Sequence, residues 1–159
     1  MNKESEANGA SLKTSGVDTS ITNSIKYKTI EIEGQKIFYR EAGSPSKPAI
    51  VLLHGFPSSS HMFRNLIANL KGKYHLVAPD YPGFGNSSMP STKEFEYSFD
   101  HLANVVDSFI EALNLKTYSL YMMDYGAPVG FRIATKHPEK IAYLLIQKGN
   151  AYIEGLSPF

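Results

Sequence analysis

The chain has 159 residues, about the length of one domain, and 42% of them are hydrophobic, which is enough to build a packed core. Its 16 Lys and Arg residues nearly balance its 15 Asp and Glu residues, so the net charge of +1 indicates neither a nucleic-acid surface nor an acidic tail. The absence of cysteine excludes disulfide scaffolds, thiol catalysis and cysteine-bound metals.

The N-terminal stretch over residues 1–24 is rich in Ser, Thr, Asn and Gly and has too few apolar residues to bury a face. We predict a flexible polar tail there, followed by a partial domain over residues 25–159. The tail lacks the apolar segment of a secretory signal, and no window of the chain approaches the roughly 18 apolar residues of a membrane span. We therefore expect a cytoplasmic protein with no membrane and no nucleic-acid partner.

Short runs rich in β-branched and aromatic residues begin after this tail. Tyr27–Ile32 and Lys36–Arg40 predict an antiparallel hairpin, because Gly34 between them supplies the positive φ of a tight turn. Ala49–Leu53 is continuously apolar, as is typical of a parallel strand buried on both faces. Three later runs have the same character: His75–Ala78, Tyr118–Tyr121 and Ile141–Ile146.

Apolar residues at helical spacing separate these strands. The three-and-four spacing predicts helices over 63–70 and 99–113. A third predicted helix, over 126–137, ends where Pro138 forces the preceding residue out of the helical region. A hairpin followed by alternating strands and helices predicts an α/β fold, a three-layer sandwich whose mostly parallel sheet carries an N-terminal antiparallel hairpin.

Three turns follow predicted strands, at the edge of the sheet where open α/β folds bind ligands. They are His54–Ser60, Asp80–Ser87 and Met122–Pro128. Each has a simpler interpretation when taken alone. Asp124 can serve only as a helix N-cap, His54 can be a satisfied core histidine, and the glycines of the second turn do not complete a dinucleotide-binding loop.

Taken in this order and spacing, the three turns resemble those of the α/β-hydrolase fold, and within it the branch of epoxide hydrolases and haloalkane dehalogenases. The resemblance implies that Asp124 is the nucleophile, on the sharp turn between a strand and a helix. It also implies that the main-chain N–H groups of Phe56 and Tyr125 form an oxyanion hole, and that His54 supports the loop that carries the first of them.

An aspartate at this turn implies a definite reaction class. A carboxylate can attack an sp³ carbon without prior deprotonation, which gives an alkyl ester of the enzyme that activated water then hydrolyses. The resemblance implies a small apolar electrophilic substrate, no cofactor and no metal. Halide-binding Trp residues are typical of dehalogenases, and this chain has no Trp, with Tyr125 at the position after the nucleophile. We expect an epoxide-hydrolase-like activity, with a haloalkane-dehalogenase-like activity as the alternative.

The resemblance also implies parts that this sequence does not contain. In the family an acid and a general-base histidine follow the nucleophile, but the only later histidine here is His137, at the far end of the predicted helix. We therefore expect a C-terminally truncated form that lacks the lid and the last strands, with incomplete catalysis. A non-catalytic remnant or binding module of the same fold is the alternative.

Two further expectations concern the packing. Met122 stands two residues before Asp124, where many such turns have a small residue, so this turn is expected to be crowded. Residues 142–146 have the sequence of an interior strand, but no later strand is expected to pair with them. We expect this sheet edge to support self-association or to bind a complementing chain.

Overall fold

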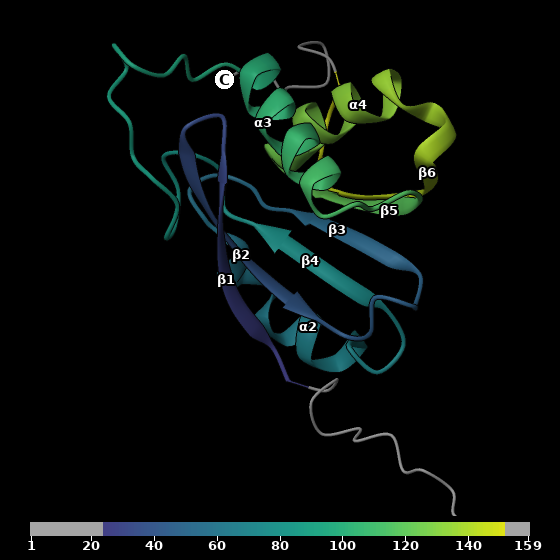
Figure 1. Cartoon of the computed structure of the whole chain (residues 1–159). Coiled ribbons are helices and arrows are strands. Elements are labelled where there is room, and N and C mark those ends of the chain that lie inside the picture. The colour runs from purple at the N-terminus through teal and green to yellow at the C-terminus, as the bar shows by residue number, and fades with distance from the viewer. Residues whose placement is uncertain (1–23, 152–159) are drawn as a thin grey trace, which may run out of the picture.

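The computed structural model describes residues 24–151, so the predicted tail lies outside the described residues except for Ser24. The elements follow the predicted order of a hairpin and then alternating strands and helices (Figure 1). The strands are β1 (Lys26–Ile32), β2 (Gln35–Ala42), β3 (Ala49–Leu53), β4 (His75–Pro79), β5 (Tyr118–Met123) and β6 (Ile141–Gln147). The helices are η1 (Ser60–Phe63), α2 (Arg64–Leu70), α3 (Phe99–Ala112), α4 (Gly126–Lys136) and η2 (Pro138–Lys140).

The six strands form one sheet in the order β1-β2-β4-β3-β5-β6. β1 pairs antiparallel with β2, and β2 pairs antiparallel with β4. From β4 onward the neighbours are parallel, with β3 in the middle between β4 and β5. The predicted fold, a mostly parallel sheet with an N-terminal antiparallel hairpin, is confirmed.

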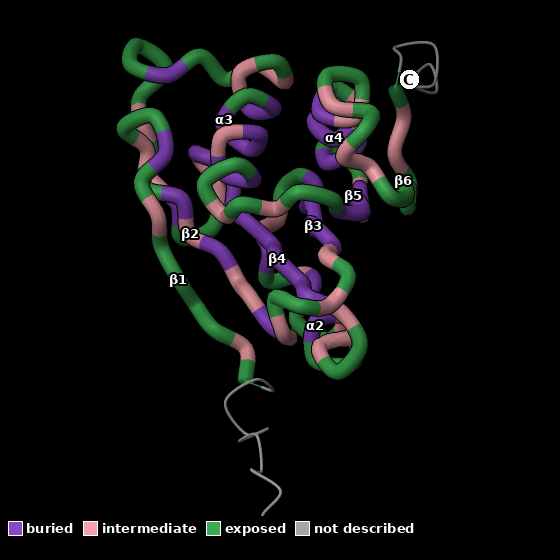
Figure 2. Tube along the Cα trace, turned by 45° about the vertical axis from the view of Figure 1, so that its right-hand side comes forward, coloured by how far each residue is buried: buried purple, intermediate pink, exposed green. Residues whose placement is uncertain are grey.

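The two faces of the sheet are covered by different helices. In β3, Val51 and Leu53 face the core made with α3 and α4, whereas Ile50 and Leu52 face Phe63 and Ile67 of the η1–α2 segment. Figure 2 shows the buried trace running through β3, β4 and the inner sides of the helices. The central strand is buried on both faces because its side chains alternate between these two cores.

β6 is the strand at the opposite end of the sheet from β1 and is poorly covered. Its residues from Ala142 to Gln147 are exposed, including Tyr143 at 74% and Ile146 at 50%. It pairs only with β5, so one edge of its main chain lacks a strand partner within the described residues. In residues 24–151 no helix is both long and apolar enough to cross a bilayer.

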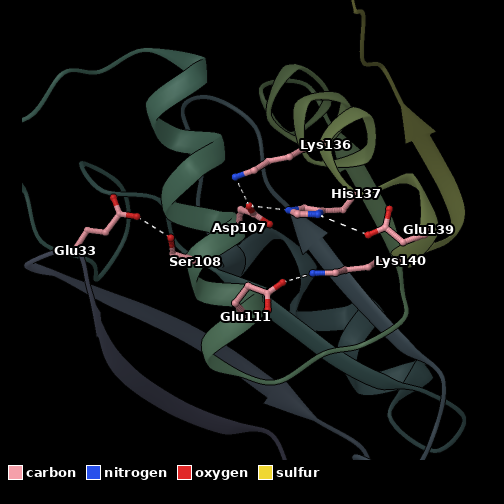
Figure 3. A network of polar contacts seen from close by, with 8 residues as sticks. All are labelled: Glu33, Asp107, Ser108, Glu111, Lys136, His137, Glu139 and Lys140. Carbon is pink, nitrogen blue, oxygen red and sulfur yellow. Dashed lines mark hydrogen bonds and ion pairs between the residues drawn. The ribbon is translucent and has the colours of Figure 1, made fainter.

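Polar contacts tie α4 to α3 at the end farthest from the start of α4 (Figure 3). The buried Asp107 of α3 accepts hydrogen bonds at Oδ2 from Lys136 Nζ at 2.7 Å and His137 Nε2 at 3.1 Å. Lys140 pairs with Glu111 one turn further along α3. These contacts, with the apolar packing between the two helices, hold α4 in place over the sheet.

Candidate active site

Asp124 lies on a sharp turn between β5 and α4. Its φ is +51°, in the left-handed region that residues with side chains seldom adopt. The helix that follows packs closely on β3, because a Cβ at Gly126 would lie 2.3 Å from the carbonyl oxygen of Leu53. The strained φ of Asp124 and the close packing at Gly126 are features of a tight strand-to-helix turn, with the Asp124 side chain at its apex.

Two main-chain N–H groups converge on one oxygen of Asp124. Phe56 N donates to Asp124 Oδ1 at 2.8 Å and Tyr125 N donates to the same oxygen at 2.7 Å. Both donors use Oδ1, so neither of them occupies Oδ2. The interpretation of Asp124 as no more than a helix N-cap is wrong, because α4 starts without a side-chain cap and one of the two donors comes from a distant loop.

The loop after β3 approaches the carboxylate closely. A Cβ at Gly55 would lie 2.5 Å from Asp124 Cβ, so only glycine fits at this position. Next to it, the ring of His54 is fully buried, with Nδ1 3.0 Å from the carbonyl oxygen of Gly55 and Nε2 3.3 Å from Tyr81 N. Burial lowers the pKa of His54, which favours the neutral imidazole.

Asp80, the first residue of the turn after β4, has a structural role in this region. It is fully buried, and its carboxylate accepts hydrogen bonds from Ser60 N at 2.7 Å and Asn86 N at 2.9 Å. It therefore joins the end of the loop after β3 to the turn after β4. The residue in the sequence that relates to this role is Gly85, because a Cβ at this position would lie 2.0 Å from Asp80 Oδ2.

Aromatic rings surround the exposed carboxylate. Phe56 stacks on Tyr125 with ring centroids 5.4 Å apart, and Phe99 and Tyr125 form a T-shaped pair with centroids 5.0 Å apart. Phe84 and Phe56 pack edge to face, with ring centroids 6.3 Å apart. Phe56 and Tyr125 are 58% and 37% exposed, so the surface beside Asp124 is apolar and open to a ligand.

The expected crowding at Met122 is resolved by a glycine on α4. Met122 is fully buried, and a Cβ at Gly130 would lie 2.2 Å from its sulfur atom. The volume that a side chain at Gly130 would fill is therefore taken by the end of Met122. The turn forms with a large residue at this position because the helix facing it provides the space.

The other four histidines are engaged away from Asp124. His137 bonds to Asp107, as expected for a residue at the far end of α4. His75 contacts Glu41, and His61 contacts Arg40. His101 contacts the carbonyl oxygen of Glu96. Among residues 24–151, no group of three or more His, Asp or Glu side chains is arranged to hold a metal ion.

Known proteins match this geometry and sequence. Residues 48–152 match the alpha/beta hydrolase fold family. An uncharacterized hydrolase of Saccharomyces cerevisiae is 46% identical over 132 residues, which are 82% of this chain and 45% of that protein. A haloalkane dehalogenase of Bradyrhizobium diazoefficiens is 33% identical over 138 residues, which are 82% of this chain and 42% of that enzyme.

Solved structures of haloalkane dehalogenases are also similar to this chain. The crystal structure of the haloalkane dehalogenase DbeA from Bradyrhizobium elkani superposes with a TM-score of 0.75 and 28% identity, covering 79% of this chain and 42% of that one. The chain thus spans less than half the length of the relatives and structures described here.

Proposed function

Because the chain belongs to the α/β-hydrolase fold family, we propose that Asp124 is the nucleophile of a hydrolase reaction and forms a covalent alkyl ester with a small apolar electrophile. The observation that carries this proposal is the convergence of Phe56 N and Tyr125 N on Oδ1. Two main-chain donors on one oxygen orient the carboxylate and direct its other oxygen, Oδ2, to the reaction.

In the first step, a lone pair of Oδ2 attacks an sp³ carbon of the substrate and forms a C–O bond. The bond from that carbon to the leaving group breaks, and its electron pair stays with the leaving group. An epoxide oxygen leaves as an alkoxide and takes a proton from water, whereas a halide leaves as the ion. The start of α4 favours negative charge on the carboxylate before the attack.

In the second step, water attacks the ester carbon Cγ of Asp124. Negative charge then develops on Oδ1, where the N–H groups of Phe56 and Tyr125 are already placed as an oxyanion hole. Collapse of this intermediate breaks the bond between Cγ and Oδ2. Oδ2 leaves with the substrate carbon and takes a proton as the alcohol, and the oxygen of the attacking water becomes part of the restored carboxylate. This step needs a general base, and the histidines of the chain have the other partners described above. We infer that the chain forms the ester more readily than it hydrolyses it.

The leaving group favoured by the residues is an epoxide oxygen. Dehalogenases of this fold commonly use indole N–H groups for the halide, and the chain contains no Trp. Carbon–halogen cleavage is the second candidate, because curated relatives of the chain are haloalkane dehalogenases. The aromatic rings of Phe56, Phe84, Phe99 and Tyr125 suit an apolar substrate of either class.

Intact mass spectrometry tests the proposal with the chain as it is. The protein is incubated separately with a reactive aryl epoxide and a primary alkyl bromide, and the Asp124→Asn variant serves as the matched control. A stoichiometric adduct on the wild type that the variant lacks supports the nucleophile, and the reagent that reacts faster identifies the leaving group. A folded wild-type protein that forms no adduct with either reagent favours a non-catalytic binding module.

A further inference from the structure

Four aromatic rings form a continuous row beside Asp124, in the order Phe84, Phe56, Tyr125 and Phe99. The two inner rings, Phe56 and Tyr125, are stacked, with 30° between their planes and centroids 5.4 Å apart. Each inner ring forms a T-shaped pair with one outer ring, at 6.3 Å for Phe84 and 5.0 Å for Phe99. We call these four rings the aromatic row.

The main chain of the two inner residues places the aromatic row next to the candidate nucleophile. Phe56 N and Tyr125 N both donate to Asp124 Oδ1, so both residues lie directly against the carboxylate. The inner rings are also the exposed ones, whereas Phe84 and Phe99 are partly buried. Contiguous exposed apolar surface of this kind marks a binding site, and here it borders the reactive group.

Both ends of the aromatic row are anchored. Phe84 forms T-shaped pairs with the buried rings of His54 and Tyr81, at 5.4 Å and 6.0 Å between centroids. At the other end, the guanidinium carbon of Arg132 lies 5.9 Å from the centroid of Phe99. The outer rings are therefore held in place, and a ligand can bind to the inner rings without first ordering the whole row.

We propose that the aromatic row binds an aryl group, so that the preferred substrate carries an aromatic ring close to its electrophilic carbon. This inference rests on the proposed function, because the row selects a substrate only if Asp124 attacks one. Aromatic rings have a negative face and a positive edge, so an aryl group can extend the row by the same stacked and T-shaped contacts. A saturated ring of similar size buries similar apolar area but lacks this charge distribution, and we expect it to bind more weakly.

Two matched ligands test the preference without any reaction. The Asp124→Asn variant is used, because asparagine keeps an acceptor oxygen for the two N–H groups but is a poor nucleophile. Benzyl alcohol and cyclohexylmethanol are titrated into this variant, and binding is followed by the NMR shifts of the Phe56 and Tyr125 amides. We expect benzyl alcohol to bind about 2- to 10-fold more tightly. Equal affinities, or tighter binding of cyclohexylmethanol, overturn the proposal.

Leucine variants in the same background test whether the aromatic row causes the preference. Phe56→Leu and Tyr125→Leu each keep the main-chain N–H and an apolar side chain but remove one inner ring. We expect each to lower the ratio of the two affinities toward unity. Tyr27→Leu is the matched control, because it removes an exposed ring from the edge strand β1, and it should leave the ratio unchanged. A preference that survives both substitutions in the row overturns the assignment.

Alkylation of the wild type separates this inference from the proposed function. Allylbenzene oxide and allylcyclohexane oxide both carry their ring one methylene group away from the epoxide, so the ring changes the intrinsic reactivity little. We expect the aryl epoxide to alkylate Asp124 faster, by a factor in the same range as the affinities. Equal rates and equal affinities overturn the aryl preference and leave Asp124 as the nucleophile. No alkylation by either epoxide, with tighter binding of benzyl alcohol, overturns the proposed function and leaves the aryl-binding row intact.

Discussion

The main-chain N–H of Phe56 donates a 2.8 Å hydrogen bond to Oδ1 of Asp124, a residue 68 positions later in the sequence. The two residues meet because β3 and β5 are adjacent parallel strands, with Leu53 opposite Met122 in the register. Parallel strands end at the same edge of a sheet, so the turns that follow them lie side by side. The pairing of strands thus brings the donor and the carboxylate together.

The close contact between α4 and β3 at Gly126 predicts that adding one methyl group there lowers the stability of the fold. Gly126→Ala would place a Cβ 2.3 Å from the carbonyl oxygen of Leu53, and this backbone atom in the centre of the sheet cannot move away cheaply. We expect the free energy of unfolding to fall by about 1–3 kcal/mol in urea denaturation.

Gly72→Ala is the control for this substitution, because a Cβ at Gly72 meets no atom within 4 Å. It is expected to leave the midpoint of unfolding nearly unchanged. A Gly126→Ala protein as stable as the wild type would show that α4 packs less closely on the sheet than described here.

Much of the fold was predictable because its signals are local. The apolar run of Ala49–Leu53 and the spacing of Phe99–Ala112 depend on residues near one another, and both elements form as predicted. The helix predicted to begin at Phe63 is preceded by the short helix η1, because the Ser59 side chain accepts from His61 N and starts a turn there. This hydrogen bond is not part of a periodic apolar pattern, so the spacing of apolar residues did not indicate the short helix.

The candidate site was predictable only in part. The turn types and glycines placed Asp124, Phe56 and Tyr125 at one edge of the sheet. The role of Asp80 depends in part on Ser60, which lies 20 positions earlier, and the space for Met122 depends on Gly130 on the helix that follows. Neither contact belongs to a periodic apolar pattern, so the spacing of apolar residues did not indicate it.

The cluster around Glu41 predicts a pH dependence of stability. Glu41 accepts from His75 Nε2 at 2.8 Å and pairs with Lys28 across the hairpin. The hydrogen bond from His75 is the largest cause that lowers the pKa of Glu41 from 4.5 to about 2. A lowered folded-state pKa stabilises the fold fully above the unfolded-state value near 4.5, and this contribution is lost as the pH falls toward 2.

We therefore expect thermal stability to fall between about pH 4.5 and pH 2 more steeply in the wild type than in Glu41→Gln. Melting curves followed by circular dichroism over this range measure the difference. Parallel pH profiles of the two proteins would contradict the assignment of this dependence to Glu41.

The polar contacts between α3 and α4 predict a coupling between two substitutions. Asp107 is buried, and its Oδ1 has no hydrogen-bond partner among the described residues, so its charge relies on the donors at Oδ2. Lys136→Met removes one of these donors and is expected to lower the free energy of unfolding by about 1–3 kcal/mol. In an Asp107→Leu background the same change should cost much less, because no buried charge remains.

A double-mutant cycle in urea measures this coupling between Lys136 and Asp107. Lys140→Met, which breaks the exposed pair with Glu111, is the control and is expected to have the smaller effect. Additive effects of the Lys136 and Asp107 substitutions would show that the contact contributes little.

The exposed edge strand β6 predicts association of the purified chain. Its sequence from Ile141 to Gln147 has no charged residue, and its exposed side chains include Tyr143 and Ile146. Uncharged edge strands pair readily with other strands. We expect the apparent mass in size-exclusion chromatography with light scattering to rise with concentration, and Ile146→Lys to suppress this rise.

Tyr27→Lys on β1, at the other end of the sheet, is the matched control and should associate like the wild type. Its side chain is also exposed, at 61%, but Lys26 and Lys28 already flank it with charge. A wild type that stays monomeric at all concentrations would contradict self-association, and a complementing chain would then be the remaining expected partner of β6.

We propose that Asp124 attacks an apolar electrophile and carries it as an ester. Its most direct test is peptide mapping of the epoxide-treated protein by tandem mass spectrometry, which assigns the added mass to a residue. We expect the added mass to lie on Asp124 and to be removed by hydroxylamine, as is typical of an ester. An adduct that maps instead to a histidine, lysine or another carboxylate, with Asp124 unmodified, would contradict it.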